Sequence, residues 1–128
     1  MIYVDTSVLL AQLWAEDRTP PSSLWERPLI SSRLLEYETW TRIHAKNLAA
    51  QYGDAARALL GHVSFLELAG PVLARALEPF SFSVCTLDAL HVASLEFLRS
   101  QRQPVELASF DTRMLAAAAS MGIPLLSM

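Results

Sequence analysis

Four acidic residues occupy positions at which an α/β fold would gather them. Asp5 directly follows a short apolar run, and Asp111 comes just after another. Asp88 and Glu38 lie near the beginnings of two segments with the apolar spacing of helices. Ligands of open α/β sheets bind at the carboxyl ends of the strands. We therefore expect the four side chains to share one site.

Carboxylates crowded at one end of a sheet repel one another and raise each other's pKa. A hard divalent cation relieves this repulsion, and Mg²⁺ favours a few carboxylates together with waters and phosphate oxygens. Neither a His pair nor a Cys cluster is present, so zinc is disfavoured. Such a cation polarises a phosphoryl oxygen and activates a bound water. The acids therefore indicate phosphodiester hydrolysis by a metal-activated water.

Each of these acids, taken alone, has a simpler explanation. Asp5 and Asp111 both precede predicted helices and could be plain N-caps. Asp88 in a first helical turn is favoured by the helix dipole, and Glu38 has Arg42 four residues later, as in an ordinary surface pair. Their joint placement, rather than any one of them, supports a metal site.

Strands and helices alternate along the chain. The pattern predicts strands at 2–4, 29–30, 63–68, 105–109 and 124–126. It predicts helices at 8–14, from a Ser31 or Ser32 N-cap to about Gln51 with Gly53 as its end, and at 54–60, 71–78, 87–98 (capped by Thr86) and 112–121. This alternation is typical of βαβ units, in which helices cover both faces of a parallel sheet.

Composition sets broader limits. The 128 residues fit one domain, 1–128, and 52% of them are apolar, as in a globular protein. A single cysteine, Cys85, excludes an internal disulfide and favours a cytoplasmic location. The first residues lack the features of a signal peptide, and no apolar run reaches the roughly 20 residues of a membrane span. The net charge of −3 is unusual for a nucleic-acid-binding protein, although bound Mg²⁺ would make the acid cluster locally less negative.

Four segments, taken in order, resemble the PIN domain, and within that family the VapC-type toxins of toxin–antitoxin pairs. They are MIYVDTS at 1–7, SSRLLEYE at 31–38, TLDALHVA at 86–93, and ASFDTRM at 108–114 followed by ASMGIP at 119–124. The third is the most specific, because it matches the family's Asp-Ala-x-His-x-Ala pattern. In the second, the spacing of six residues after Ser32 selects Glu38 over its rival Glu36.

The resemblance implies a three-layer α/β sandwich with a parallel sheet in the order 3-2-1-4-5. It implies a homodimeric endoribonuclease that uses Mg²⁺ or Mn²⁺, cleaves RNA and is neutralised by a cognate antitoxin protein. The implied metal ligands and catalytic residues are Asp5, Glu38, Asp88 and Asp111, with Thr6, Ser7 and His91 beside them. For His91 a structural role is favoured over that of a general base.

Two other functions stay open. One is a PIN-like nuclease of RNA processing or repair without an antitoxin, and the other is a receiver-like signalling module, which also gathers acids at strand ends. A receiver needs an acidic pair soon after its first strand, whereas here only Asp5 follows at once.

The substrate-contacting surface is less well defined by the sequence. The stretch from Glu16 to Pro28 is short and interrupted by two prolines, so that no substrate groove can be inferred there. Four basic residues could contact RNA phosphates or be plain surface charges: Arg33, Arg42, Lys46 and Arg113.

Overall fold

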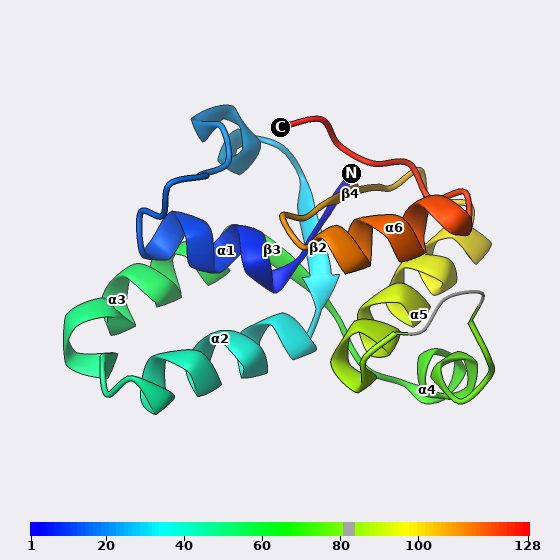
Figure 1. Ribbon diagram of the computed structural model, residues 1–128, viewed down its shortest axis with the longest axis horizontal. Coiled ribbons are helices and arrows are strands. Elements are labelled where there is room, and N and C mark those ends of the chain that lie inside the picture. The colour runs from blue at the N-terminus through cyan, green and yellow to red at the C-terminus, as the bar shows by residue number, and fades with distance from the viewer. Residues whose placement is uncertain (81–83) are drawn as a thin grey trace.

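A parallel sheet forms the centre of the computed structural model, which describes residues 1–80 and 84–128 (Figure 1). Its strands are β1 (Ile2–Val4), β2 (Leu29–Ser32), β3 (Val63–Leu66) and β4 (Glu106–Ala108). They lie in the order β3-β2-β1-β4, and every pair is parallel. The predicted α/β fold with a parallel sheet is confirmed.

The predicted fifth strand is reduced to a single bridge. Leu125 pairs in parallel with Leu107, next to β4, where the order 3-2-1-4-5 places it. Leu107 donates its N–H to the carbonyl of Pro124, and Leu126 donates to the carbonyl of Leu107. Proline has no N–H to extend such a ladder, which is consistent with the brevity of the pairing.

Helices cover both faces of the sheet. The first group is α1 (Thr6–Leu13), α2 (Leu34–Ala45) and α3 (Ala49–Leu60), and the second is α4 (Gly70–Ala76), α5 (Thr86–Ser100) and α6 (Thr112–Ser120). α1 packs against α2 and α3, while α5 packs against α4 and α6 (Figure 1). A 3₁₀ helix, η1 (Ser22–Glu26), lies in the proline-containing stretch. None of the described helices is long and apolar enough to cross a membrane.

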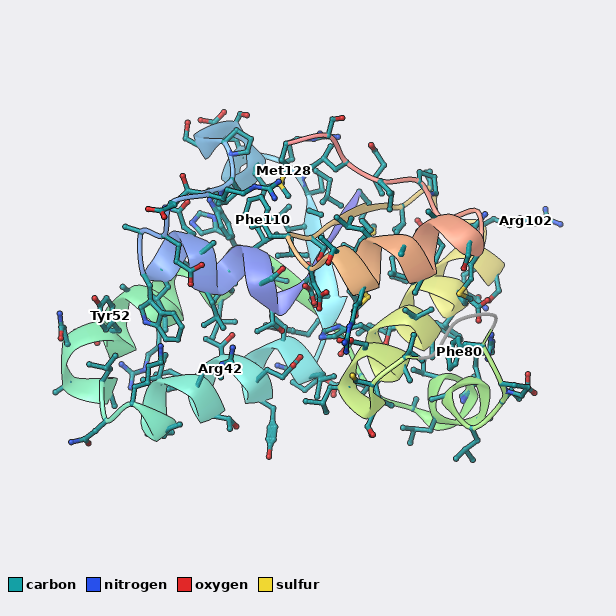
Figure 2. All side chains as sticks on the ribbon, in the orientation of Figure 1. Arg42, Tyr52, Phe80, Arg102, Phe110 and Met128 are labelled. Atoms are coloured by element: carbon teal, nitrogen blue, oxygen red, sulfur yellow. The ribbon has the colours of Figure 1, made fainter. Side chains whose placement is uncertain are left out.

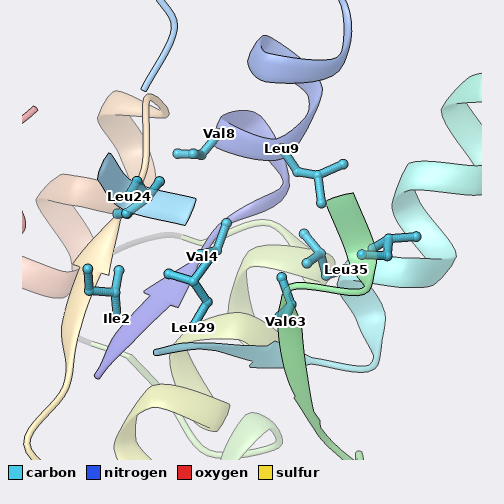
Figure 3. Packing of buried hydrophobic residues seen from close by; sticks show 10 residues of the cluster. Ile2, Val4, Val8, Leu9, Leu24, Leu29, Leu35 and Val63 are labelled. Carbon is cyan, nitrogen blue, oxygen red and sulfur yellow. The ribbon is translucent and has the colours of Figure 1, made fainter. Parts of the chain in front are cut away.

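The alternation of side chains along β1 divides the core in two. Ile2 and Val4 belong to a cluster with Val8 and Leu9 of α1 (Figure 3). Tyr3 belongs to the cluster formed with α5, β4 and α6 on the opposite face. Successive residues of a strand point to opposite faces, so the central strand must be apolar at every position to be covered on both sides.

The boundary between α2 and α3 differs from the prediction. The predicted helix runs to about Gln51, but α2 ends at Ala45 and Asn47 adopts a left-handed conformation with φ of 54°. The N–H groups of Asn47 and Leu48 bond to the carbonyls of His44 and Ile43, a helix-ending arrangement in which asparagine is the usual substitute for glycine. Gly53, predicted to be a helix end, is buried within α3.

The helix caps predicted from the sequence differ in part from those of the structure. Thr86 is the first residue of α5 and provides no side-chain cap. The N-cap position of α2 is Arg33, and Ser32 lies just before it, where its Oγ still accepts a hydrogen bond of 2.9 Å from the N–H of Leu34. α1 begins at Thr6, two residues earlier than predicted, because Asp5 is its N-cap.

Candidate active site

A pocket of about 390 Å³ opens at the carboxyl end of the central strands. Its lining includes the four acids selected from the sequence: Asp5, Glu38, Asp88 and Asp111. Each comes from a different part of the chain: after β1, in α2, in α5 and before α6. The fold therefore brings all four acids to one pocket, and Thr6 and Ser7 line the same pocket.

Asp5 is buried, with 5% of its surface exposed. Its Oδ2 accepts hydrogen bonds from the hydroxyls of Ser7 at 2.7 Å and Ser109 at 2.9 Å, and a longer one from the N–H of Ser7. No hydrogen bond to its Oδ1 arises from the described residues; the Nε2 of His91 is 4.0 Å away. Asp5 is therefore an N-cap and a pocket residue at once, since Oδ2 takes all its hydrogen bonds from the described residues and Oδ1 is left available.

Asp111 follows the same pattern at the beginning of α6. Its Oδ1 accepts from the N–H groups of Arg113 at 2.9 Å and Met114 at 3.4 Å. Its Oδ2 accepts no hydrogen bond from residues 1–80 or 84–128. The N-cap explanation and the site explanation are thus compatible for this residue as well.

Glu38 lies on the inner side of α2. Its Oε1 accepts hydrogen bonds from Thr6 Oγ1 at 2.9 Å and from His91 Nε2 at 2.6 Å. Glu36 lies elsewhere on the helix and forms an exposed ion pair with Arg33 at 3.4 Å. The geometry places Glu38, and not Glu36, at the pocket.

Asp88 lies in the first turn of α5 and makes no hydrogen bond within the described part of the chain. Burial raises the pKa of its carboxyl, and the negative charges of Asp111 and Asp5 raise it further. A carboxyl whose pKa is raised by other carboxyls is the electrostatic signature of crowded acids. This crowding is the condition that a bound cation would relieve.

His91 is 1% exposed and lies between Glu38 and Tyr3. Its Nδ1 is 2.7 Å from the hydroxyl oxygen of Tyr3. Burial alone would lower the pKa of His91, but Tyr3 and the neighbouring acidic groups outweigh burial and raise this pKa to about 10.

Two residues at the site escaped the sequence analysis. Ser109 donates its hydroxyl to Asp5 Oδ2 and accepts the N–H of Asp111, both at 2.9 Å, so that it joins two of the acids. Tyr3 contacts His91 from within the strand. The available signals were weak: a serine in a closing segment, and one hydroxyl in an otherwise apolar run.

The basic residues considered for RNA contact differ in whether they line the pocket. Arg42 lines the pocket. Arg33 pairs with Glu67 at 2.6 Å and stacks on Phe65, and Lys46 lies over the ring of Trp14. Arg42, which Figure 2 labels on α2, is therefore the cation best placed to meet a ligand.

The donor chemistry fits a hard cation. Asp5, Glu38 and Asp111 each use one carboxylate oxygen in hydrogen bonds and keep the other without one among the described residues, while Asp88 keeps both. In their present positions, no three such described groups lie close enough to hold an ion by themselves. Mg²⁺ ordinarily binds one or two carboxylates and completes its shell with water and phosphate, without an all-protein cage. The spacing of these acids is compatible with that mode of binding.

Comparison with known proteins agrees with this geometry. The PIN domain model matches residues 2–127, and the chain belongs to that family. It is 27% identical over 132 residues to "Ribonuclease VapC47" of Mycobacterium tuberculosis (strain CDC 1551 / Oshkosh), which covers 95% of this chain and 93% of the relative. The crystal structure of Mycobacterium tuberculosis VapC20, a sarcin–ricin-loop-cleaving toxin, has a similar fold with a TM-score of 0.56 and 21% identity. That match covers 91% of this chain and 95% of the other.

Proposed function

We propose that this PIN-domain protein is a Mg²⁺-dependent endoribonuclease that acts as the toxin of a toxin–antitoxin pair. The observation that carries the proposal is the convergence of four carboxylates on one pocket, each with an oxygen left without a hydrogen bond from the described residues. The likeness to a relative named as a ribonuclease supports RNA as the substrate.

The proposed ligands of the cation are Asp5, Glu38, Asp88 and Asp111. When bound, Mg²⁺ or Mn²⁺ would supply Lewis-acid stabilisation of the phosphate and activation of a water. Ser7 and Ser109 hold Asp5 in place, and Thr6 and His91 hold Glu38. Arg42 is positioned to contact a phosphate of the RNA backbone.

Metal removal tests the enzymatic proposal. We expect the purified protein to cleave RNA in Mg²⁺, to lose cleavage in EDTA, and to regain it when Mg²⁺ or Mn²⁺ is added back. Product analysis on a labelled RNA should show internal cuts. Cleavage that persists after complete metal removal would contradict the proposal.

The toxin assignment requires a partner, and the pocket indicates its chemistry. Four acids at one opening, in a chain with a net charge of −3, favour a basic segment. Arginine can bind carboxylates in a bidentate, charge-assisted manner. We infer that an arginine of a co-encoded antitoxin enters the pocket and competes with the cation for the same oxygens.

Competition makes a specific prediction about inhibition. In the purified pair, residual RNase activity should rise as Mg²⁺ is raised at constant ionic strength, because cation and guanidinium exclude each other. Replacing the arginines of the partner's tail should abolish this Mg²⁺ dependence. Inhibition that is insensitive to both changes would instead indicate steric blocking of the RNA path.

Other expected properties remain proposals. A homodimer, a single domain spanning 1–128 and action in the cytoplasm follow from the resemblance and the composition. A PIN-like nuclease of RNA processing or repair would share the same site, so the presence of an antitoxin encoded beside this chain distinguishes the two functions.

A further inference from the structure

A chain of buried hydrogen bonds crosses the interior and ends at the pocket. The backbone N–H of Ser32 donates to the hydroxyl oxygen of Tyr3 at 3.2 Å. That hydroxyl contacts His91 Nδ1 at 2.7 Å, and His91 Nε2 contacts Glu38 Oε1 at 2.6 Å. Tyr3 and Ser32 are fully buried, and His91 is 1% exposed.

The direction of the last bond follows from its acceptor. A carboxylate can only accept, so the Nε2 of His91 donates its proton to Glu38 Oε1 when that side chain is a carboxylate, as a metal ligand must be. This holds whether Nδ1 accepts the proton of Tyr3 or carries a second proton itself. A hydrogen-bond donor is therefore fixed against one oxygen of Glu38.

The donors are arranged on one side of that carboxylate. Thr6 Oγ1 and His91 Nε2 both bind Oε1, while Oε2 accepts no hydrogen bond from the described part of the chain. Together they fix the orientation of the carboxylate and leave one oxygen available to the pocket. The chain of hydrogen bonds also joins β1, the end of β2, α2 and α5. Glu38 lies in α2, Asp88 lies in α5, and Asp5 directly follows β1.

An apolar residue at Tyr3 would leave the buried N–H of Ser32 without this acceptor, and one at His91 would leave the Tyr3 hydroxyl without its ring partner. Buried polar groups specify a structure only when every member is satisfied, and they are costly otherwise. A satisfied chain that ends on a pocket carboxylate has a clear use, because residues that orient metal ligands commonly determine metal affinity.

We propose that Tyr3 and His91 are positioning residues that hold Glu38 in the orientation required for divalent-cation binding. The proposal rests on the function proposed above, because it assigns Glu38 to a metal site. It adds Tyr3, which lies two positions before Asp5 in the chain and acts on a different acid, Glu38, through His91. It also specifies which Glu38 oxygen stays available. His91 then acts through Glu38 and needs no contact with RNA.

Removal of a single hydroxyl tests the role of Tyr3. Tyr3→Phe keeps the buried ring, and we expect the dissociation constant for Mn²⁺, measured by calorimetry, to rise by about 3- to 10-fold. The KM for RNA should be unchanged. The matched control is Thr39→Val, which removes a fully buried hydroxyl on α2 whose one hydrogen bond among the described residues is to the carbonyl of Leu35. Its Mn²⁺ affinity should equal that of the wild type.

The His91 variants separate donation from packing. His91→Gln can still offer an N–H to Glu38 and should retain part of the Mn²⁺ affinity, whereas His91→Leu should lose about 10- to 100-fold. In wild-type protein, the ¹⁵N shifts of the His91 ring should show Nε2 protonated, and they should change in Tyr3→Phe. Equal Mn²⁺ affinities for wild type, Tyr3→Phe and His91→Leu would overturn the positioning role.

These measurements keep the two proposals distinguishable. Mn²⁺ binding and the ring ¹⁵N shifts are read without any substrate. A protein that binds Mn²⁺ through this chain but cuts no RNA would contradict the ribonuclease proposal and support the positioning role. If RNA cleavage and Mn²⁺ affinity are both unaffected in Tyr3→Phe and His91→Leu, the ribonuclease proposal would be supported and the positioning role contradicted.

Discussion

Replacing Asp5 or Asp88 with asparagine is expected to reduce RNA cleavage by at least about 100-fold, since even the residues that orient metal ligands are commonly worth 10- to 100-fold. Each substitution removes a charge and a preferred oxygen ligand from a site with few protein donors. Asparagine caps a helix about as well as aspartate, so Asp5→Asn should leave α1 intact. Initial rates on a labelled RNA in saturating Mg²⁺ measure the effect.

The control for these variants is Asp54→Asn. Asp54 is an exposed acid of α3 that pairs with Arg57 at 2.9 Å, so its loss removes the same charge outside the pocket. Its turnover should match that of the wild type. Wild-type turnover in Asp5→Asn or Asp88→Asn would exclude that residue from the catalytic set.

Thermal unfolding gives an independent view of Asp88→Asn. Burial and the neighbouring acids raise the pKa of Asp88, which means that its charge is less favourable in the metal-free fold than in the unfolded chain. Removing that charge should raise the metal-free melting temperature, even as cleavage is lost. Added Mg²⁺ should stabilise the wild type much more than the variant, since a ligand stabilises the state that binds it.

Glu38→Gln is the second substitution with a large expected effect, a loss of at least about 100-fold in cleavage rate, because Glu38 is a proposed ligand and even the residues that orient ligands are commonly worth 10- to 100-fold. Its matched control is Glu36→Gln, two positions away and about 200° around the helix. Glu36 is half exposed and pairs only with Arg33 among the described residues, so its loss should change the rate by less than about 2-fold. Kinetics of both variants under one Mg²⁺ concentration decide between the two acids, and a collapse confined to Glu36→Gln would reverse the assignment.

The sequence was sufficient for the sheet because buried strands have a simple signature. Apolar runs at 2–4 and 29–30 could only be covered strands, and the structure pairs Ile2 with Leu29 in parallel. The acids could be located for a related reason: Asp5 and Asp111 follow strands that end at the same edge of the sheet. The resemblance to the PIN family, with its acid six residues after Ser32, then distinguished Glu38 from Glu36.

The incorrect predictions of helix ends lie where the local signals of glycine and asparagine compete with tertiary packing. Gly53 was expected to end a helix, but it is buried within α3, where an added Cβ would make ordinary contacts with Arg57 and Trp40 at 3.5 and 3.7 Å. The actual break uses Asn47, a weaker signal that only the backbone hydrogen bonds reveal. Tertiary packing therefore outweighed the helix-ending tendency of glycine.

Side-chain contacts between residues far apart in the chain could also not be predicted from the sequence. Ser109 and Tyr3 meet Asp5 and His91 across 104 and 88 positions of the chain, respectively. No periodicity or spacing connects such residues, since their meeting depends on strand register and on the packing of α5. The acids and their neighbours Thr6, Ser7 and His91 could be predicted, but Ser109 and Tyr3 could not.

The most direct test of the account is a paired Mg²⁺ titration of the wild-type protein after treatment with EDTA. Cation binding, followed by calorimetry, and RNA cleavage, followed by initial rates, are measured over the same concentrations at constant ionic strength. We expect both curves to have the same midpoint, and both to disappear in Asp88→Asn. Full cleavage before any Mg²⁺ is added, or cation binding that persists unchanged in Asp88→Asn, would contradict a metal site built from these acids.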